Sequence, residues 1–360
     1  MKNRYIKSRC VLLGAIAATG LSMNASALEV IGETLEIYGT VRLSLDYGMT
    51  DLDATDDNVS LSSNTTIIGF RGAYDIPDTP YKALWQLEQN FNPGINVGDT
   101  FSNRDTFLGV ETPYGIFRAG LMDTPFKKMG VAYTIYSTTV ADPHGIIGQN
   151  SGVVPGGRLD NRGKKALQWD GEFGGLKLNV MYGLDQQSES QYTVDDNDND
   201  MFSVRADWEM GGLQLAAAFV DYSNLSDAAG ATDAYRVAAA YAFGSAKVGA
   251  IYEDVDSELA SLSRAAYGAY LTYRVRPRTT AGLQWMHAEE SESGDDAADQ
   301  LGVVVYHAIT QKLLVHAAYS LVDNESNGQY RVGDWAHGVR QSTVPGGESS
   351  AFSVGAQLSF

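Results

Sequence analysis

The chain has almost no cysteine and no long apolar segment. Its single cysteine, Cys10, lies in a short N-terminal leader, so the rest of the sequence has no thiol. This excludes disulfides, thiolate metal sites and a cysteine nucleophile after the leader. No apolar run of 18 residues follows residue 27, whereas a membrane-crossing helix needs about 20. The sequence therefore excludes a helical membrane protein.

The leader has the layout of an export signal. Four basic residues precede an apolar run at residues 11–21, and the small residues Ala25-Ser26-Ala27 follow it. This order predicts a signal peptide over residues 1–27 and one mature domain over residues 28–360. A buried N-terminal helix is the alternative, and the order of charge, apolar run and cleavage site disfavours it. Lys7 stands where a lipoprotein signal needs an apolar residue, so no lipid anchor is expected.

Basic residues are scarce. Lys and Arg total 26 against 44 Asp and Glu, which gives a formal net charge of −18. The leader holds basic residues and no acids, so the exported part is more acidic still. Nucleic-acid binding needs a basic face, and we expect none.

The sequence offers no metal or catalytic motif. The acidic run at residues 195–200 resembles the start of a calcium loop. However, counting from Asp196, the sixth position is Met201, where an EF-hand needs glycine. A solvated acidic loop is the favoured interpretation, with loosely bound Ca²⁺ or Mg²⁺ as the alternative. The five histidines show no metal-ligand or triad spacing, so we expect no cofactor and no enzyme activity.

Alternation with a period of two runs through most of the chain. At the C-terminus, Phe352, Val354 and Phe360 fall on one face, and Ser353 and Gln357 fall on the other, as in a strand with one apolar side. Most such segments run about 9–12 residues, which suits a tilted membrane strand. Sixteen are predicted, centred near Val41, Ile68, Leu87, Leu108, Phe117, Gln168, Val180, Val204, Ala217, Ala239, Ala250, Ala269, Leu283, Val304, Ala317 and Ala356.

The connections alternate between short and long. Glycine pairs such as Gly174-Gly175 and Gly211-Gly212 mark tight turns, and long acidic loops such as residues 185–200 and 323–350 lie between them. Aromatic residues gather at both ends of the strands. This pattern predicts an all-β fold, a 16-stranded antiparallel transmembrane β-barrel. A soluble β-sandwich is the alternative, but it does not require aromatics at both ends.

The charged face of each strand should line the bore. An Arg or Lys facing lipid at the bilayer midplane costs about 2–4 kcal/mol, so the apolar face must meet lipid. Sixteen strands leave an aqueous channel, whereas eight are filled by side chains. The architecture therefore predicts conduction.

Several segments together resemble the general porin family of Gram-negative bacteria. They are Ile37-Tyr38-Gly39, residues 103–110, residues 114–121, residues 123–126 and the terminal Phe360. The resemblance implies a homotrimeric passive channel in the outer membrane, in contact with lipopolysaccharide and outer-membrane lipid. It also implies a long third loop folded into the lumen and a C-terminal signal, Phe360, read by the barrel-assembly machinery. Residues 92–100 are a candidate inter-subunit latch.

The same resemblance implies a charged constriction where the third loop meets the wall. The basic wall residues expected by strand parity are Arg42, Arg71, Lys82, Arg104, Arg118 and Arg162. The expected acidic loop residues are Asp123 and Asp142, while Lys127 and Lys128 depart from an acidic loop. Basic wall and acidic mouth oppose each other, so the hypothesis is weak or mixed ion selectivity. The alternative is that these charges are simply solvated lumen residues.

Three functions follow from these predictions. The leading one is passive diffusion of ions and small hydrophilic solutes. The second is a substrate-specific channel for a sugar, phosphate or acidic nutrient, which would be supported by a line of inward aromatics; few are expected, namely Tyr38, Tyr270 and Tyr306. The third is an outer-membrane barrel hydrolase, which would need a Ser/His or acid/His site at a rim.

Overall fold

The computed structural model describes residues 28–31, 34–51, 58–92, 104–148, 158–186, 199–333, 337 and 344–360. The predicted signal at residues 1–27 lies outside these ranges. So does the candidate latch, apart from Asn92, and so does most of the acidic run at 195–200.

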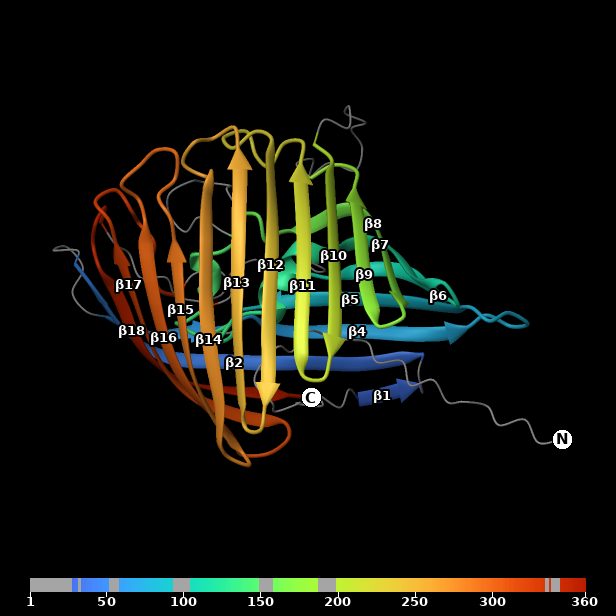
Figure 1. Cartoon of the computed structure of the whole chain (residues 1–360). Helices are drawn as coiled ribbons and strands as arrows, with labels where there is room; N and C mark the ends of the chain where they lie inside the picture. Colours follow the sequence, from blue (N-terminus) through green and yellow to red (C-terminus); the bar gives the residue numbers. More distant parts are fainter. Residues whose placement is uncertain are drawn as a thin grey trace.

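One antiparallel sheet closes on itself, because β2 pairs with β18 on one side and with β3 and β4 on the other. Figure 1 shows β9 to β14 as one wall, with β2, β4 and β5 behind them. The strands are β1 (Leu28–Ile31), β2 (Leu35–Thr50), β3 (Asn58–Ser63), β4 (Thr66–Asp75), β5 (Lys82–Phe91), β6 (Thr106–Thr112), β7 (Gly115–Asp123), β8 (Arg162–Phe173), β9 (Leu176–Gly183), β10 (Met201–Met210), β11 (Leu213–Tyr222), β12 (Thr232–Phe243), β13 (Ala246–Ser257), β14 (Arg264–Arg276), β15 (Thr279–Ala288), β16 (Ala298–Ala308), β17 (Leu313–Asn324) and β18 (Ser349–Ser359).

The prediction of a closed, sixteen-stranded antiparallel barrel is confirmed. β3 and β4 are two halves of one wall strand, since both pair with β2. Asn64 and Thr65 interrupt it, and Thr65 has a positive φ of 58°. β1 is a short extra strand that pairs with the start of β2. The other strands coincide with the predicted segments.

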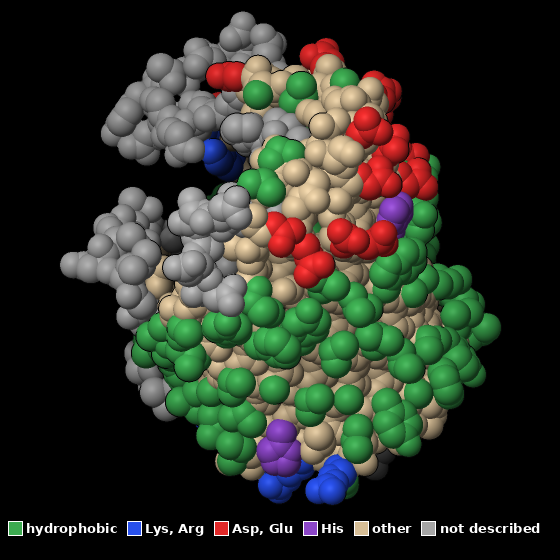
Figure 2. All heavy atoms as spheres, turned by 90° about the vertical axis from the view of Figure 1, so that its left-hand side faces the viewer, with side chains coloured by type: hydrophobic (Ala, Val, Ile, Leu, Met, Phe, Trp, Pro, Cys, Tyr) green, Lys and Arg blue, Asp and Glu red, His purple; other side chains and the backbone are tan. Residues whose placement is uncertain are grey.

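The two faces of the wall differ as the alternation predicts. On β12, Tyr235 and Val237 are exposed while Arg236 between them is 0% exposed. On β16, Val303 and Val305 are exposed while Val304 is fully buried. Figure 2 shows the exposed hydrophobic side chains as a broad belt across the face in view. The charged and polar side chains therefore face the bore.

Tight turns and the C-terminus complete the barrel. Gly174 and Gly175 have φ of 58° and 90°, the left-handed values that a two-residue hairpin requires. Phe360 extends the closure: its N–H donates to the Gly39 oxygen (3.0 Å), and its own oxygen accepts from Gly39 N–H (3.1 Å). A Cβ at position 39 would lie 2.5 Å from the Phe360 ring, so this seam needs glycine.

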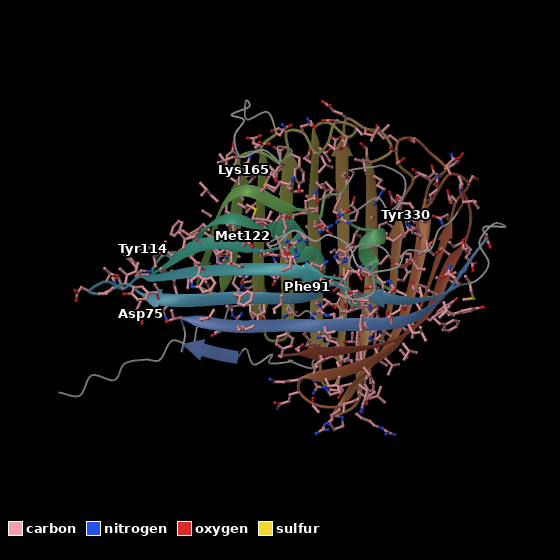
Figure 3. All side chains as sticks on the ribbon, turned by 180° about the vertical axis from the view of Figure 1, so that it is seen from behind. Asp75, Phe91, Tyr114, Met122, Lys165 and Tyr330 are labelled. Carbon is pink, nitrogen blue, oxygen red and sulfur yellow. The ribbon has the colours of Figure 1, made fainter. Side chains whose placement is uncertain are left out.

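The long connection between β7 and β8 contains the helical part of the described chain. It holds α1 (Pro125–Ala132) and a 3-10 helix, η1 (Pro143–Gly145). In both Figure 1 and Figure 3, α1 lies between the front and back walls of the sheet. Among the described residues, neither helix has the length and apolar character needed to cross a membrane.

Candidate pore constriction

Two helix caps shape the β7–β8 connection. Thr124 Oγ1 accepts the Lys127 N–H (3.2 Å), and Pro125 follows at the first helical position, a standard helix start. Asp142 Oδ1 accepts the His144 N–H (3.0 Å) at the start of η1. Tyr136 and Thr138, between the helices, have positive φ of 73° and 78°, so tight packing must hold this stretch in place.

The connection packs against the inner faces of β10 to β16. Phe126 N–H donates to Ser203 Oγ on β10 (3.1 Å), and Arg264 Nη2 on β14 donates to the Ile146 oxygen (2.7 Å). The segment therefore lies on the side of the wall opposite the exposed apolar belt.

A seat on β15 and β16 receives residues 135–142. Gln284 Oε1 accepts the Ile135 N–H (3.0 Å), and Gln300 Nε2 donates to the backbone carbonyl oxygen of Asp142 (3.1 Å). Beside these glutamines, a Cβ at Gly282 would collide with Tyr136 Oη, and one at Gly302 would lie 2.8 Å from the Ala141 Cβ. We call Gly282, Gln284, Gln300 and Gly302 the glycine–glutamine seat. It allows the backbones to approach closely and satisfies buried polar groups of the loop.

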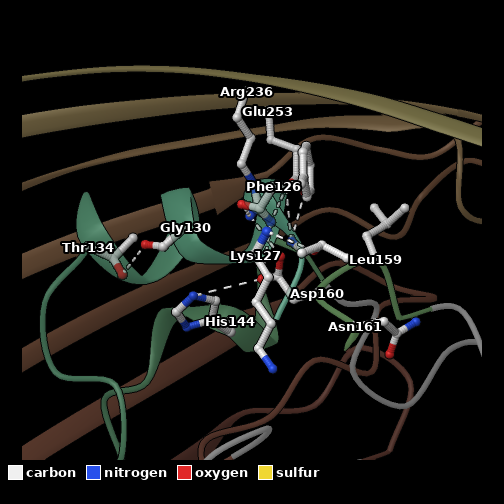
Figure 4. A network of polar contacts seen from close by, with 12 residues as sticks. Phe126, Lys127, Gly130, Thr134, His144, Leu159, Asp160, Asn161, Arg236 and Glu253 are labelled. Carbon is white, nitrogen blue, oxygen red and sulfur yellow. Dashed lines mark hydrogen bonds and ion pairs between the residues drawn. The ribbon is translucent and has the colours of Figure 1, made fainter. Parts of the chain in front are cut away.

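A buried ionic network anchors the connection to β12 and β13 (Figure 4). Arg236 Nη1 donates to Asp160 Oδ1 (2.7 Å), and its Nε donates to Glu253 Oε2 (2.5 Å). The same guanidinium donates to the Phe126 oxygen (3.0 Å) and lies 3.9 Å from the Phe126 ring centroid. Glu253 also accepts the Gly148 N–H (2.8 Å). We call Arg236, Asp160 and Glu253 the Arg236 anchor; their side chains are 0% exposed.

His144 joins the anchor to the 3-10 helix. Its Nδ1 lies 2.7 Å from Asp142 Oδ1, and its Nε2 lies 3.8 Å from Asp160 Oδ2. Asp142 is thus buried against η1 and the β16 side of the wall. The structure places it in this network and not beside the predicted basic wall.

Part of the predicted constriction does come together on the other side of the connection. Arg162 contacts Asp105 (2.9 Å) and Asp123 (3.1 Å), and Lys127 Nζ donates to Asp123 Oδ1 (2.5 Å). Arg104 Nε donates to Glu88 Oε1 (2.5 Å). The other carboxylate oxygen of Glu88, Oε2, accepts a hydrogen bond from Tyr38 Oη (3.0 Å). We call the charged groups of this region, Glu88, Arg104, Asp105, Asp123, Lys127 and Arg162, the charged cluster.

The remaining predicted residues lie around or away from that cluster. Arg71 pairs with Glu36 (2.8 Å), and Arg118 pairs closely with Asp170. Lys82 lies at the turn end of β5, 3.4 Å from Asp75, far along the strand from the cluster residue Glu88.

Two further bases are held by neutral groups. Arg42 donates to Gln357 Oε1 (2.9 Å) and to the Thr65 oxygen (3.0 Å). Lys128 Nζ donates to Gln168 Oε1 (3.2 Å). Among the described residues, neither base has a carboxylate oxygen within 4.0 Å.

Sequence reasoning missed the carboxylates that neutralise the wall: Glu36, Glu88, Asp105 and Asp170. Glu36, Glu88 and Asp170 share the inner face of their strands with the arginines, so parity could have identified them, whereas Asp105 precedes β6, where strand parity does not apply. Their pairing depends on register, as where Glu36 lies directly opposite Arg71.

Burial changes the proton affinity of loop side chains. It lowers the pKa of Lys127 to about 8, and the neighbouring Asp123 only partly offsets that effect. Burial also lowers the pKa of Lys128. The hydroxyl pKa values of Tyr133 and Tyr136 are raised, mainly by burial, so both tyrosines are neutral hydrogen-bonding groups at ordinary pH.

One buried cluster contains the residue types of a hydrolase. On the polar face of β2, the His337 Nε2 lies 3.3 Å from Asp46 Oδ2 and 3.4 Å from Ser44 Oγ. In a catalytic triad the carboxylate and the hydroxyl contact different ring nitrogens, whereas here both contact the same one. Within the described ranges, no group of three or more His, Cys, Asp or Glu side chains is arranged to hold a metal ion.

A closed antiparallel barrel with an apolar outer belt and a charged inner face is a membrane-spanning pore-type protein. The particular family follows from the sequence profile of the Gram-negative porins, which matches residues 12–327. The chain therefore belongs to the Gram-negative porin family, and its place is the outer membrane.

Individual relatives are more distant. The chain is 28% identical over 170 residues to the major outer membrane protein P.IA of Neisseria meningitidis, a match that covers 46% of this chain and 41% of that protein. It is 29% identical over 119 residues to the P.IB protein of Neisseria gonorrhoeae, covering 31% and 33%. These matches span less than half the length of either relative.

Solved structures agree on the fold. An anion-selective porin from Comamonas acidovorans superimposes with a TM-score of 0.72 at 15% identity, covering 91% of this chain and 99% of that one. OmpT, an outer membrane protein of Vibrio cholerae, superimposes with a TM-score of 0.66 at 16% identity, covering 91% and 99%. At these identities the likeness concerns the fold alone.

Proposed function

We propose that this protein is a passive diffusion channel for ions and small hydrophilic solutes, narrowed by the β7–β8 connection. The observation that carries the proposal is the attachment of that connection to the polar face of the wall, by the Arg236 anchor and the glycine–glutamine seat. The attachment holds Asp123 and Lys127 beside Arg104 and Arg162. The constriction then acts by size and by its fixed charges, and no residue needs to change covalently.

The charge balance supports weak selectivity with a small preference for anions. Most bases near the connection have a carboxylate neighbour, and paired charges create little net field. Arg42 and Lys128 are held by neutral groups, so their charges are the least compensated. A fixed charge in a pore with low-dielectric walls raises the local concentration of counter-ions. Asp142 contributes little to this field in the proposal, because it is buried beside His144.

Planar bilayers test this function. The refolded mature protein should insert as discrete, ohmic conductance steps, and a KCl gradient should give a small reversal potential on the anion side. Absence of conductance would overturn the pore. A reversal potential near the ideal value for either ion would overturn weak selectivity while leaving the pore intact.

A substrate-specific channel is the second candidate. The weakly compensated charges of Arg42 and Lys128 favour an anionic nutrient such as phosphate over a neutral sugar. Saturation of conductance by phosphate, at concentrations where chloride conductance still rises linearly, would support it. We further propose that the chain has no hydrolase activity, because Asp46 and Ser44 contact the same nitrogen of His337. Hydrolysis of ester or peptide substrates by purified protein would contradict this.

The assembly and its partners follow from the family. We propose a homotrimer, which should insert in groups of three equal conductance steps. The seam between Phe360 and Gly39 supports a role for the C-terminal aromatic in barrel assembly, so Phe360→Ala should lower the yield of folded protein in the outer membrane. Lipopolysaccharide, bridged by loosely bound Ca²⁺ or Mg²⁺, is the proposed partner of the long-loop rim.

A further inference from the structure

The short-turn rim carries one strongly basic sector. Arg274, Arg276 and Arg278 lie around the β14–β15 turn, and Lys312 lies in the β16–β17 turn. All four are exposed. In Figure 2, basic side chains gather at the bottom of the molecule beside a histidine, directly below the hydrophobic belt.

The two turns form one continuous surface. The Ala308 N–H donates to the Arg278 oxygen (2.8 Å), and Arg278 Nη1 donates to the Ile309 oxygen (3.2 Å). Thr279 Oγ1 and His307 Nδ1 lie 2.9 Å apart across the same pair of strands. The Ser359 N–H donates to the Lys312 oxygen (2.9 Å), which joins the C-terminal strand to this rim. We call Arg274, Arg276, Arg278 and Lys312 the basic rim.

The strands that carry the basic rim are poor in acidic residues and expose apolar side chains beside it. No Asp or Glu occurs in residues 264–283, 301–317 or 351–360, the segments that lead into and out of these turns. Tyr273, Val275 and Ile309 stand beside the basic residues and are 45% to 54% exposed. Four of the other short turns carry acids, namely Asp75, Asp78, Glu111, Glu172 and Glu209, while the β12–β13 turn carries none. The excess of positive charge is therefore a property of this sector and not of the whole rim.

We infer that the basic rim binds the head groups of anionic phospholipids in the periplasmic leaflet. A lipid phosphate carries a negative charge that complements these four basic groups, and guanidinium groups bind phosphate through paired hydrogen bonds. Exposed Tyr273, Val275 and Ile309 provide the apolar surface for the acyl chains below that phosphate. Basic side chains next to a membrane-spanning element attract anionic lipid in this way. The inference goes beyond the diffusion function and is independent of it.

Lipid retention tests the inference. The full mature protein is reconstituted in nanodiscs of equal phosphatidylglycerol and phosphatidylcholine and transferred to mild detergent, and the retained lipids are quantified by mass spectrometry. Wild type should retain mainly phosphatidylglycerol. Arg276→Gln/Arg278→Gln should lower the retained ratio by about threefold or more, since each basic group near the surface attracts anionic lipid. The enrichment should also weaken in 1 M salt, where the Debye length is about 3 Å.

A matched variant separates specific from general charge effects. Lys177→Gln/Lys247→Gln removes two positive charges at the same end of the barrel, from positions outside the basic rim. This control should keep the wild-type lipid ratio, and both variants should retain wild-type single-channel conductance, which shows that they fold.

Three outcomes would overturn the inference. In the first, the wild type retains phosphatidylglycerol and phosphatidylcholine in the ratio of the bulk lipid. In the second, the control variant loses as much phosphatidylglycerol as Arg276→Gln/Arg278→Gln does. In the third, Arg276→Gln/Arg278→Gln shifts the reversal potential but keeps the wild-type ratio of retained lipids. The last would assign these arginines to the pore mouth. Failure of the diffusion function would appear separately, as absent conductance in wild type.

Discussion

Lys127 carries the titratable charge of the charged cluster closest to neutral pH. Burial lowers its pKa to about 8, so it is protonated at pH 6 and largely neutral at pH 9.5. The anion preference should therefore fall as the pH rises through about 8. A unit charge at 4 Å contributes about 1 kcal/mol in water, so we expect the chloride-to-potassium permeability ratio to fall about two- to fivefold. Reversal potentials in a KCl gradient, measured from pH 6 to 9.5, check this.

Lys127→Met provides the control for that titration. At pH 6 the chloride-to-potassium permeability ratio of this variant should equal the wild-type ratio at pH 9.5. The ratio of the variant should change little between pH 6 and pH 9.5. A variant that still titrates like wild type would assign the effect to Lys128, whose pKa is also lowered. Lys127 is paired with Asp123, but burial outweighs that pair, so its effect on stability has the sign opposite to that of an exposed, salt-bridged lysine. Lys127 binds its proton more tightly in the unfolded chain than in the folded protein. Its contribution to the free energy of unfolding therefore increases as the pH rises above about 8.

Arg236 is the residue whose loss should most affect the connection. Arg236→Met leaves Asp160 and Glu253 buried without their cation, which costs about 3–5 kcal/mol of unfolding free energy. Urea unfolding of protein folded into lipid vesicles measures that loss. The channel should also become noisier, because the loop loses its attachment to β12. Lys165→Met, which breaks the half-exposed pair with Asp185 (2.9 Å), should cost about 1 kcal/mol or less.

A charge-neutral version of the anchor shows whether charge or packing matters. Arg236→Met/Asp160→Asn/Glu253→Gln removes the cation and both buried anions together. It should recover most of the stability lost in Arg236→Met, because replacing a whole buried ion cluster is far less costly than breaking it. Equal instability of the two variants would show that the Arg236 side chain acts through packing against Phe126.

Strand parity predicts which residues face the bore, but it does not predict their partners. Arg104 and Arg162 were predicted as wall residues because the sequence around each resembles the wall positions of the porin family. Glu88 was missed as the partner of Arg104, since that contact depends on how β5 and the start of β6 align. Asp142 was expected beside the basic wall because it is acidic and in the loop. Its cap on η1 and its contact with His144 bury it elsewhere.

At the scale of elements, the loop depends on the absence of side chains at the seat. Gly282→Ala should push Tyr136 away, because the added Cβ would collide with its hydroxyl, and overpacking of this kind costs about 1–3 kcal/mol. The displaced loop should change single-channel conductance. Tyr136 Oη is buried with no hydrogen-bond partner among the described residues, so Tyr136→Phe alone should be nearly neutral.

The rescue makes this prediction specific. Gly282→Ala/Tyr136→Phe removes the atom that would lie nearest the new Cβ and leaves the ring carbon Cζ at 2.7 Å, so it should recover much of the wild-type conductance and unfolding free energy. If the double variant behaves like Gly282→Ala, the glycine is needed for strand geometry and not for contact with the loop.

The strands were predictable and the loop path was not, for a physical reason. A strand repeats one simple rule, apolar outside and polar inside, and membrane burial enforces it at every position. The path of residues 124–148 depends on contacts with strands β10 to β16, which are far away in sequence. Tyr136 and Thr138 adopt positive φ without the glycine that would have signalled it. The break at Asn64 and Thr65 was missed for the same reason.

At the scale of the whole molecule, charge is divided between the two rims. Figure 2 shows acidic side chains gathered along the upper edge of the hydrophobic belt and basic ones at its lower end. Carboxylates on neighbouring strands lie in direct register at the acidic edge, as Asp233 does with both Asp221 and Asp256. Like charges directly opposite each other destabilise a sheet. The barrel is therefore expected to need counter-ions at this edge.

Removal of divalent cations tests that expectation. In vesicles containing lipopolysaccharide and Mg²⁺, chelation should lower the unfolding temperature of the wild type, because both the carboxylates and the lipid phosphates lose the ion between them. Asp221→Asn/Asp233→Asn/Asp256→Asn should be insensitive to chelation and more stable than wild type without Mg²⁺. Glu111→Gln/Glu172→Gln/Glu209→Gln removes three acids from the opposite rim and should respond to chelation like wild type. An equal response of all three proteins would show that the ion stabilises the lipid and not the edge of the barrel.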